Sequence, residues 1–444
     1  MNDPSRPVPG LIIAAPSSGS GKTTISLALM RALRRSGLRI APAKIGPDYI
    51  DPGFHAAACG HPSLNLDLWG MRAETRAALI DQLHFESDLI LAEGVMGLYD
   101  GAADGRGSSA DLAEETGWPI LLVVDVKGQA ATAAAVVRGL VTHRDDLRFA
   151  GILFNRVGGR RHADMLRRAV AETGLGVPVL GCLPRVEGLT LESRHLGLVQ
   201  ARERADLEVL LERAADWMVD NADLDAILTA AAAGSRVEFD APVPIPPLGQ
   251  RIAVARDAAF DFVYPHILQG WRTAGSEILP FSPLADEAPS DIADAVYLPG
   301  GYPELHAGRI AANGTFLTGL RRKARGGSAI FAECGGYMVL GRTLRDADGT
   351  THAMAGLLPV ETDFSLRRLH LGYRRAETVA DGAPWPKGTR LSAHEFHYAT
   401  TLHEDPDAPP LFHAHDALGE DKGRQGLSIG RVSGSFLHLI DRGR

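Results

Sequence analysis

The sequence of 444 residues predicts an α/β protein made of two parallel-sheet domains. Apolar runs of strand length alternate with segments of helical periodicity, which is the pattern of a parallel sheet covered by helices. The alternation stops at a proline-rich stretch and starts afresh after it. The chain also exceeds the length of one domain of about 150 residues, so two or three domains are expected.

Six apolar runs in the first half of the chain predict strands. They are Leu11–Ile13, Leu38–Ala43, Asp88–Ala92, Pro119–Val124, Phe149–Phe154 and Val177–Cys182. The segment Ala201–Ala232 is charged, rich in alanine and helical in period. The prolines of Ala241–Pro247 neither continue a helix nor suit the centre of a strand. We therefore assign residues 1–240 to the first domain, 241–250 to a proline-rich linker and 251–444 to the second domain.

A second strand–helix alternation begins after the linker. Its predicted strands are Arg251–Ala255, Glu277–Phe281, Ala295–Leu298 and Ser328–Ala332. Segments with β-like patterns follow near residues 353–360, 370–379 and 427–432. The second domain is therefore expected to begin as an α/β sheet and to end in strands.

Composition and charge exclude several classes of protein. The net charge of −8 provides no basic surface for nucleic acid. No stretch reaches the roughly 18 apolar residues of a membrane span, and residues 1–7 lack the apolar core of a signal peptide. Cys59, Cys182 and Cys334 are too few for a disulfide framework or a zinc cluster. We expect a cytoplasmic protein with neither nucleic acid nor membrane as a partner.

A glycine-rich loop follows the first apolar run and precedes an amphipathic one. It comprises Ser18, Gly19, Ser20, Gly21, Lys22, Thr23 and Thr24. The glycines let backbone N–H groups close around polyphosphate oxygens, Lys22 adds a mobile charge, and Thr23 offers a hydroxyl to Mg²⁺. Pro16 stands where the strict motif has glycine. Strand, loop and helix together predict a P-loop that binds ATP.

Carboxylates follow two other predicted strands of the first domain. Ligands of an open parallel sheet collect at the carboxyl ends of its strands. Asp48 and Glu93 occupy such ends. Because Mg²⁺ prefers hard oxygen ligands, we predict that Thr23, Asp48 and Glu93 hold the metal beside the nucleotide phosphates.

Four further residues at strand ends have two interpretations each. Tyr49, Asp51 and Asp100 are candidates for the substrate site. They also lie in Asp-Pro-Gly and Tyr-Asp-Gly sequences, which are good turns. Asn155 ends the run Phe149–Phe154, where either a nucleotide base or ribose binds or the chain simply turns.

The second domain contains a candidate nucleophile, Cys334. An apolar strand runs into this cysteine, and Gly335, Gly336 and a helical segment follow it. The glycines permit the sharp turn of a nucleophile elbow, and the N-terminus of the helix is expected to lower the pKa of the thiol. A buried structural cysteine is the alternative.

A thiolate that attacks an amide also needs an oxyanion site and a base. Gly300 and Gly301 follow a predicted strand, and their backbone N–H groups are candidates for the oxyanion site. His438 is the candidate base, with His394 and His397 as rivals. The last two could also suggest a metal pair, but no third ligand cluster stands near them in the sequence, so no metal is expected there.

These motifs, in this order, resemble one family over essentially the whole chain: the glutamine-dependent cobyrinic or hydrogenobyrinic acid a,c-diamide synthases of corrinoid biosynthesis. The first domain is similar to dethiobiotin synthetase, and the second resembles the class I glutamine amidotransferase domain. The resemblance is carried by residues 18–24, 44–52, 93–101, 298–304 and 333–337.

The resemblance implies a ligase with two sites. Cys334 and His438 would release ammonia from glutamine, with Gly300 and Gly301 holding the oxyanion. Mg-ATP would phosphorylate a carboxylate of the tetrapyrrole, ammonia would attack the acyl phosphate, and two rounds would give the diamide. The family analogy assigns charge neutralisation to Lys44 and the shaping of the substrate site to Tyr49, Asp51 and Asp100.

One position departs from the class I pattern. Those domains commonly have a glutamate two residues after the catalytic histidine, whereas Ile440 stands there in this chain. The resemblance therefore implies a Cys334–His438 dyad without the usual orienting acid.

Two other functions use the same motifs. A Ni-sirohydrochlorin a,c-diamide synthase would apply these residues to another tetrapyrrole. A P-loop switch ATPase would carry the second domain as a glutaminase-like interaction module, although such a module has no need of an exposed thiolate. A homodimer is expected because dethiobiotin-synthetase-like domains often pair and two-fold dimers are the commonest assemblies.

Overall fold

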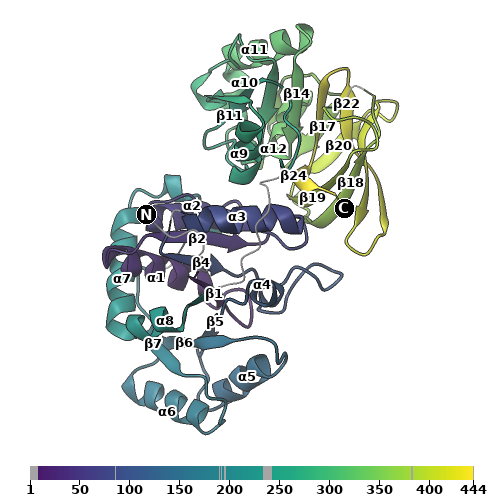
Figure 1. The fold of residues 1–444 in the computed structure, drawn as a ribbon. Coiled ribbons are helices and arrows are strands. Elements are labelled where there is room, and N and C mark those ends of the chain that lie inside the picture. The colour runs from purple at the N-terminus through teal and green to yellow at the C-terminus, as the bar shows by residue number, and fades with distance from the viewer. Residues whose placement is uncertain are drawn as a thin grey trace. The chain divides into compact units, whose positions relative to one another are not determined.

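The computed structural model describes residues 9–85, 87–189, 191, 193–194, 197–233, 243–381 and 384–443. They divide into two compact units (Figure 1). The first contains the described residues up to Trp69 and those from Arg76 to Ala233. The second contains Gly70–Thr75 and the described residues from Val243 onward. No helix among the described residues is long and apolar enough to cross a membrane.

The first unit is built on a parallel sheet with the strand order β3-β2-β4-β1-β5-β6-β7. The short strand β10 pairs with β1 in the antiparallel direction. Its strands are β1 (Pro9–Ala14), β2 (Ile40–Ile45), β3 (Leu64–Leu66), β4 (Leu89–Glu93), β5 (Ile120–Asp125), β6 (Phe149–Val157), β7 (Val179–Pro184) and β10 (Ala232–Ala233), with a separate hairpin of β8 (Ser193–Arg194) and β9 (Gly197–Leu198).

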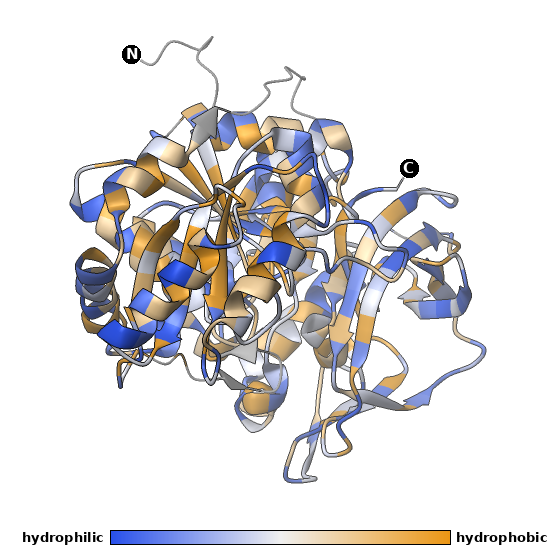
Figure 2. Ribbon diagram, turned by 90° about the horizontal axis from the view of Figure 1, so that it is seen from below, coloured by the Kyte–Doolittle hydropathy of each residue, from blue (hydrophilic) through white to orange (hydrophobic). Residues whose placement is uncertain are grey.

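Helices pack around this sheet. Its strands are mostly apolar, whereas its helices mix apolar and polar residues (Figure 2), as expected for a sheet buried between helices. The helices are α1 (Lys22–Arg35), α2 (Asp51–Cys59), α3 (Ala73–Phe85), α4 (Ser109–Thr116), α5 (Thr132–Val141), α6 (Arg160–Ala171), η1 (Ala201–Glu203), α7 (Leu207–Asn221) and α8 (Leu224–Ala230). The helical segment predicted at 201–232 is thus divided into η1, α7 and α8, followed by β10.

The predicted strands of the first unit are present, but several ends are wrong. The run expected at 38–43 is β2, which continues to Ile45. The run expected at 149–154 is β6, which continues to Val157. Lys44 of β2 pairs in register with Glu93 of β4, and Asn155 of β6 pairs with Asp125 of β5. The apolar pattern ends where polar site residues begin, whereas backbone pairing continues through them.

The second unit combines parallel and antiparallel strands in one sheet with the order β12-β11-β13-β14-β23-β22-β21-β18-β19-β24. Neighbours are parallel from β12 to β23 and antiparallel from β23 to β24. The strands are β11 (Arg251–Ala255), β12 (Glu277–Phe281), β13 (Ala295–Leu298), β14 (Ala329–Glu333), β18 (His370–Thr378), β19 (Arg390–His397), β21 (Pro410–Asp416), β22 (Asp421–Ile429), β23 (Val432–Ser435) and β24 (Leu437–Arg442).

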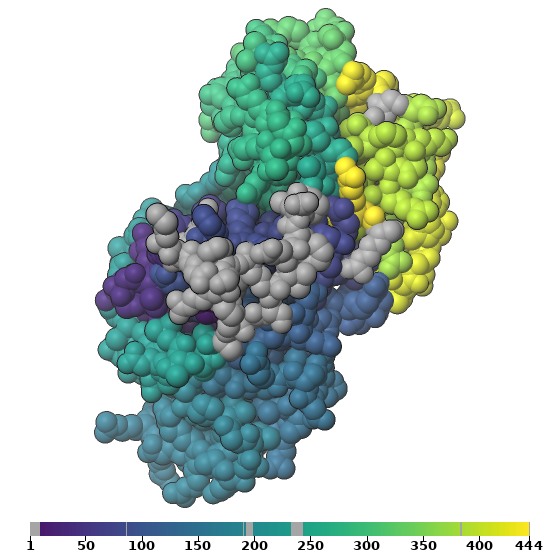
Figure 3. Space-filling view, viewed as in Figure 1, coloured from purple at the N-terminus to yellow at the C-terminus, as the bar shows by residue number. Residues whose placement is uncertain are grey.

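A smaller four-stranded sheet and short helices complete this unit. The sheet contains β15 (Thr343–Arg345), β16 (Thr351–Ala353), β17 (Val360–Asp363) and β20 (Thr400–Glu404). The helices are α9 (Pro265–Thr273), η2 (Pro283–Ala285), η3 (Pro303–Leu305), α10 (Ala307–Ala312), α11 (Gly314–Arg325) and α12 (Gly335–Leu340). The strand expected near 353–360 is wrong, because β16 ends at Ala353 and β17 begins at Val360. The green α/β part and the yellow C-terminal strands lie side by side in Figure 3.

Two segments are fastened to the second unit by specific bonds. The first is the proline-rich stretch, which is described from Val243 on. The indole N–H of Trp271 donates to Ile245 O (3.0 Å), and that of Trp385 donates to Pro246 O (3.0 Å). Its first residues, Ala241 and Pro242, lie outside the described residues, as does the N-terminal segment 1–7. Arg72 donates from its backbone N and from Nη2 to the buried carboxylate of Asp441, both at 2.9 Å.

Candidate active sites

The phosphate loop has the backbone that its glycines predict. Gly19 and Gly21 have φ of 78° and 91°, a left-handed conformation that glycine adopts without strain. A Cβ on Gly21 would lie 2.3 Å from Nδ2 of Asn155, so only glycine fits there. Lys22 begins α1, and its Nζ donates to the carbonyl oxygens of Ser17 (3.3 Å) and Met96. Burial lowers the pKa of Lys22 to about 8.

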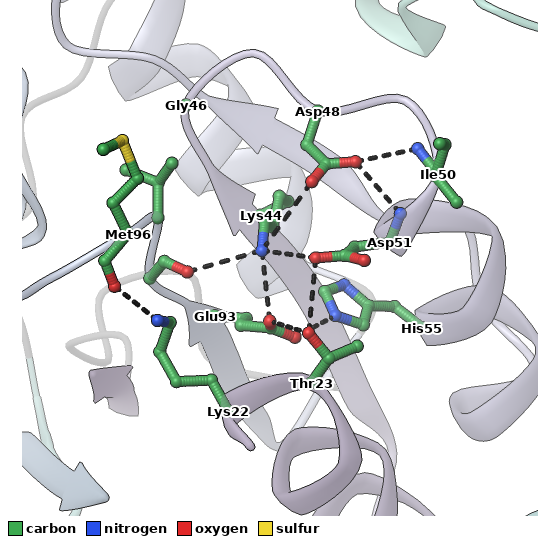
Figure 4. A network of polar contacts seen from close by, with 12 residues as sticks. Lys22, Thr23, Lys44, Gly46, Asp48, Ile50, Asp51, His55, Glu93 and Met96 are labelled. Atoms are coloured by element: carbon green, nitrogen blue, oxygen red, sulfur yellow. Dashed lines mark hydrogen bonds and ion pairs between the residues drawn. The ribbon is translucent and has the colours of Figure 1, made fainter. Parts of the chain in front are cut away.

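A polar network lies beside this loop (Figure 4). Thr23 Oγ1 donates to Glu93 Oε1 at 2.7 Å and lies 3.5 Å from Asp51 Oδ2. Lys44 Nζ lies 2.6 Å from Asp51 Oδ2, 3.1 Å from Glu93 Oε1 and 3.9 Å from Asp48 Oδ2. Strand β2, helix α2, strand β4, helix α1 and the loop between β2 and α2, which carries Asp48, therefore bring five predicted residues together.

The network carries more negative than positive charge. Three carboxylates surround the single ammonium of Lys44. Burial alone would raise the pKa of Glu93, but Lys44, His55 and Thr23 together hold it below the usual range. Burial and the neighbouring carboxylate of Asp48 raise the pKa of Asp51. An excess of buried carboxylate oxygens beside a threonine hydroxyl is a suitable environment for Mg²⁺.

Asp48 and Tyr49 lie on the loop between β2 and α2, and Asp100 lies on the loop between β4 and α4. Asp48 Oδ1 accepts from the backbone N–H of Ile50 (2.8 Å) and Asp51 (3.1 Å), so it also caps the start of α2. Tyr49 is half-buried on the same loop. Asp100 is exposed, and its Oδ2 accepts from Gly97 N at 2.7 Å.

Asn155 supports the phosphate loop directly. Its Nδ2 donates to the carbonyl oxygen of Ser20 at 2.9 Å, and the side chain is buried. The hydrogen bond connects the end of β6 with the loop between Gly19 and Gly21. The sequence places Asn155 at a strand end but does not indicate this contact.

His55 belongs to the same network, although it is not among the residues predicted from the sequence. Its Nε2 lies 2.7 Å from Glu93 Oε2 and its Nδ1 lies 3.2 Å from Ser63 Oγ. The ring is fully buried on α2. The sequence signal that could have found it is spacing: His55 follows Asp51 by four residues, and residues i and i+4 share a face where the segment is helical, as it is in α2.

In the second unit, Cys334 occupies a nucleophile elbow between β14 and α12. Its φ of 46° is rare for a residue with a side chain and indicates local strain. A Cβ on Gly335 would lie 2.6 Å from Pro303 Cδ, and one on Gly336 would lie 2.2 Å from Leu298 O. The two glycines therefore let the elbow pack against the loop that carries Gly300 and Gly301.

His438 and Cys334 converge on Gly300. A Cβ on Gly300 would lie 2.3 Å from His438 Cε1 and 3.3 Å from Cys334 Cβ. A Cβ on Gly301 would lie 2.1 Å from Ala259 O. Both glycines are therefore sterically required, and the four predicted residues of this site lie together.

The expected lowering of the thiol pKa is wrong for this structure. Burial raises the pKa of Cys334, and the carboxylate of Glu304 adds to this effect, whereas the backbone N–H of Gly335 opposes it weakly. Cys334 is only 3% exposed, and α12 has only six residues. Burial also lowers the pKa of His438 to about 3, helped by His394 and His397. The resting pair is therefore a thiol and a neutral imidazole.

Glu333, the residue before Cys334, also faces the base. Its Oε2 lies 3.9 Å from His438 Nδ1 and accepts from the hydroxyl of Tyr297 at 2.7 Å. Its Oε1 accepts from the backbone N–H of Leu439 at 3.0 Å. Burial raises the pKa of Glu333 to about 8, against the effect of these two hydrogen bonds.

His397 does have further potential ligands nearby, contrary to the expectation from sequence. His370, Glu395 and His397 place their ligand atoms within 4.8 Å of one another. The imidazole planes of His370 and His397, however, are stacked at 3° with centroids 4.6 Å apart. The nitrogen lone pair of an imidazole lies in the plane of its ring, so the lone pairs of two parallel, separated rings do not point at one ion. In addition, Glu395 Oε2 lies 2.6 Å from Arg374 Nη2, so the arrangement favours a structural cluster.

Comparisons with known proteins match sequence in both units. Residues 11–199 match the CobQ/CobB/MinD/ParA nucleotide binding domain, and residues 251–444 match the CobB/CobQ-like glutamine amidotransferase domain. The hydrogenobyrinate a,c-diamide synthases of Brucella anthropi and Rhodobacter capsulatus are each 54% identical, covering 97% of this chain and 98% of theirs. That of Rhizobium meliloti is 52% identical, covering 97% and 99%. The chain therefore belongs to the hydrogenobyrinate a,c-diamide synthase family.

Proposed function

We propose that this protein amidates the a and c carboxylates of hydrogenobyrinic acid in cobalamin biosynthesis, using ATP and ammonia released from glutamine. The observation that carries the proposal is the 54% identity to synthases of that name along 97% of the chain. The two sites described above supply the chemistry that such a ligase requires.

Glutamine is hydrolysed in the second unit. The Cys334 thiol gives its proton to His438, and its sulfur attacks the carboxamide carbon of glutamine. Backbone N–H groups at Gly300 and Gly301 stabilise the oxyanion of the tetrahedral intermediate. The C–N bond then breaks, the departing nitrogen takes the proton from His438, and ammonia leaves. Water, deprotonated by His438, then attacks the thioester carbon; the C–S bond breaks, glutamate is released, and the Cys334 sulfur takes the proton back from His438.

The carboxylate is activated in the first unit. The backbone N–H groups of residues 18–24 and Lys22 would bind the phosphates of ATP, and Asn155 holds the loop in shape. Thr23, Asp48 and Glu93 would hold Mg²⁺, with Asp51 close by. When bound, the metal supplies positive charge that offsets the charge of the polyphosphate.

Phosphoryl transfer turns a poor acyl donor into a good one. An oxygen of the corrinoid carboxylate attacks the γ-phosphorus, and the bond to ADP breaks. Ammonia then attacks the acyl carbon, loses a proton and displaces inorganic phosphate. We assign Lys44 to neutralising charge at this centre, and Tyr49, Asp51 and Asp100 to shaping the site around the substrate.

Two other functions are less well supported. A Ni-sirohydrochlorin synthase would use the same residues, but the relatives named above are hydrogenobyrinate synthases. A P-loop switch would not need the strained elbow at Cys334 or its convergence with His438 on Gly300. We therefore rank hydrogenobyrinic acid first among the tetrapyrrole substrates.

Mass spectrometry of the products tests the proposal. The purified protein is incubated with Mg-ATP, glutamine and, separately, hydrogenobyrinic acid, cobyrinic acid and Ni-sirohydrochlorin. Each activated carboxyl group exchanges OH for NH₂. We therefore expect the mass of hydrogenobyrinic acid to fall twice in succession, by about one mass unit each time. ATP hydrolysis without any mass change would support the switch function instead.

The metal, the assembly and the location are further parts of the proposal. Product formation should require Mg²⁺, and chelation of the metal should abolish it without affecting glutamine hydrolysis in the absence of ATP. We expect a homodimer, which light scattering of the purified protein would test. We also expect the protein in the cytoplasm, which fractionation of cells would test.

A further inference from the structure

In class I domains the acid commonly stands two residues after the catalytic histidine, and that position is Ile440 in this chain. A carboxylate nevertheless faces His438 from another strand. Glu333 Oε2 lies 3.9 Å from His438 Nδ1. The two residues are 3% and 1% exposed, so water screens the interaction little. Glu333 ends β14, immediately before Cys334, whereas His438 lies on β24.

Glu333 is held in place from both sides. Tyr297 on β13 donates its hydroxyl to Oε2 at 2.7 Å. Leu439, the residue after His438, donates its backbone N–H to Oε1 at 3.0 Å. One carboxyl group therefore fixes the strand that presents the nucleophile relative to the strand that presents the base.

We propose that Glu333 is the positioning residue for His438, in place of the acid of the class I triad. This inference rests on the glutaminase activity proposed above. Nδ1 faces Glu333, which favours the tautomer with a proton on Nδ1 and leaves Nε2 to accept the thiol proton. Once His438 is an imidazolium, the adjacent carboxylate stabilises it.

The charge of Glu333 depends on the charge of His438. With His438 neutral, burial outweighs the hydrogen bonds donated by Tyr297 and Leu439 and raises the pKa of Glu333 to about 8. A positive imidazolium 3.9 Å away favours the carboxylate. The carboxylate of Glu395 on β19 is a poorer candidate, because it is already bonded to Arg374 at 2.6 Å and His397 at 3.0 Å.

Two pairs of matched variants test the proposal. Glu333→Gln removes the charge but keeps the size, and Tyr297→Phe removes the hydroxyl that orients it. The controls are Glu404→Gln and Tyr337→Phe, since Tyr337 on α12 donates to Glu404 at 3.0 Å in the same kind of tyrosine–glutamate bond. The kcat and KM of glutamine hydrolysis are measured, together with amidation supported by free ammonium.

Because Glu333→Gln removes the orienting acid, we expect its kcat to fall by about 100-fold, with the KM for glutamine within about twofold of wild type. Tyr297→Phe, which retains the acid, should lose less. Amidation with ammonium and the melting temperature should stay unchanged, and both control variants should behave as wild type.

Two results would overturn the proposal. Glutamine hydrolysis by Glu333→Gln at the wild-type kcat would show that the acid is not needed. An equal loss of glutamine-dependent and ammonium-dependent amidation, with a raised KM, would show that Glu333 serves only the fold. Absence of glutamine hydrolysis in the wild-type protein would instead refute the proposed function itself.

Discussion

Burial sets the chemical state of the residues in both sites. Lys44 is almost completely enclosed, yet burial is outweighed by the three surrounding carboxylates, which raise its pKa and keep it charged. At Cys334 and His438 burial is not outweighed by neighbouring charges, and it favours the neutral form of each. A buried charge persists only where opposite charge surrounds it.

The neutral state of the Cys334–His438 pair is the first prediction. Without glutamine, the thiol should remain protonated at pH 7, because burial raises its pKa while burial lowers that of His438. The difference in thiolate ultraviolet absorbance between wild type and Cys334→Ser, followed as pH rises, measures this directly. A thiolate signal already present at pH 7 would contradict the prediction.

Replacement of Gly300 by alanine is the second prediction. The new Cβ would lie 2.3 Å from His438 Cε1, so the ring must move away from the thiol. Gly300→Ala should lose at least about tenfold in glutamine hydrolysis, the cost of a misplaced catalytic group. The control is Gly314→Ala, where a Cβ meets nothing within 4 Å. Equal activity of the two variants would refute the steric account.

Strand β6 contributes to the ATP site through Asn155 and the phosphate loop. We predict that Asn155→Ala raises the KM for ATP by up to about tenfold, because one hydrogen bond contributes about 0.5–1.5 kcal/mol to the shape of the loop. The preference for ATP over GTP should not change, because the amide holds Ser20 O. Asn221→Ala, which removes a similar bond to Trp217 O on α7, is the control. A changed preference between the two nucleotides would instead place Asn155 at the base.

The sequence predicts the elements of the first unit better than those of the second. Strand–helix alternation identifies the parallel strands because each forms a short apolar run of its own. The antiparallel strands β19 and β24 mix polar site residues such as His394 and His438 with apolar ones, so no run marks them. β3 is too short to detect.

Some site residues can likewise be predicted from the sequence, and others cannot. Lys22, Thr23, Glu93 and Cys334 follow from motifs, because each lies next to the glycines or the strand end that it needs. Glu333 stands beside Cys334 in the sequence, but its approach to His438 depends on strand order in a ten-stranded sheet. That order arises from long-range pairing, which local patterns do not contain.

At the scale of the whole molecule, the chain contributes to the second unit twice. The short segment Gly70–Thr75 belongs to that unit although most of its neighbours in sequence belong to the first. Nothing in its composition indicates this. Arg72 within it pairs with Asp441, three residues after His438 on β24. The strand that carries the base is therefore held by a residue from the first half of the chain.

Loss of this ion pair is the fourth prediction. Arg72→Ala leaves the fully buried carboxylate of Asp441 without its guanidinium, which should cost about 3–5 kcal/mol of the free energy of unfolding of the second unit. Arg322→Ala, which breaks an exposed pair with Asp291, should cost about 0–1 kcal/mol. Hydrogen exchange of second-unit peptides in urea measures both. Equal effects would contradict the account.

The central claim is that one unit makes ammonia and the other consumes it, and exchange of the nitrogen donor tests it most directly. Diamide formation from hydrogenobyrinic acid is measured with glutamine and with ammonium for wild type, Cys334→Ser and Lys22→Ala. We predict that Cys334→Ser is inactive with glutamine but as active as wild type with ammonium. Lys22→Ala should form no diamide with either donor while still hydrolysing glutamine. Equal loss of both activities in Cys334→Ser would contradict the division of labour.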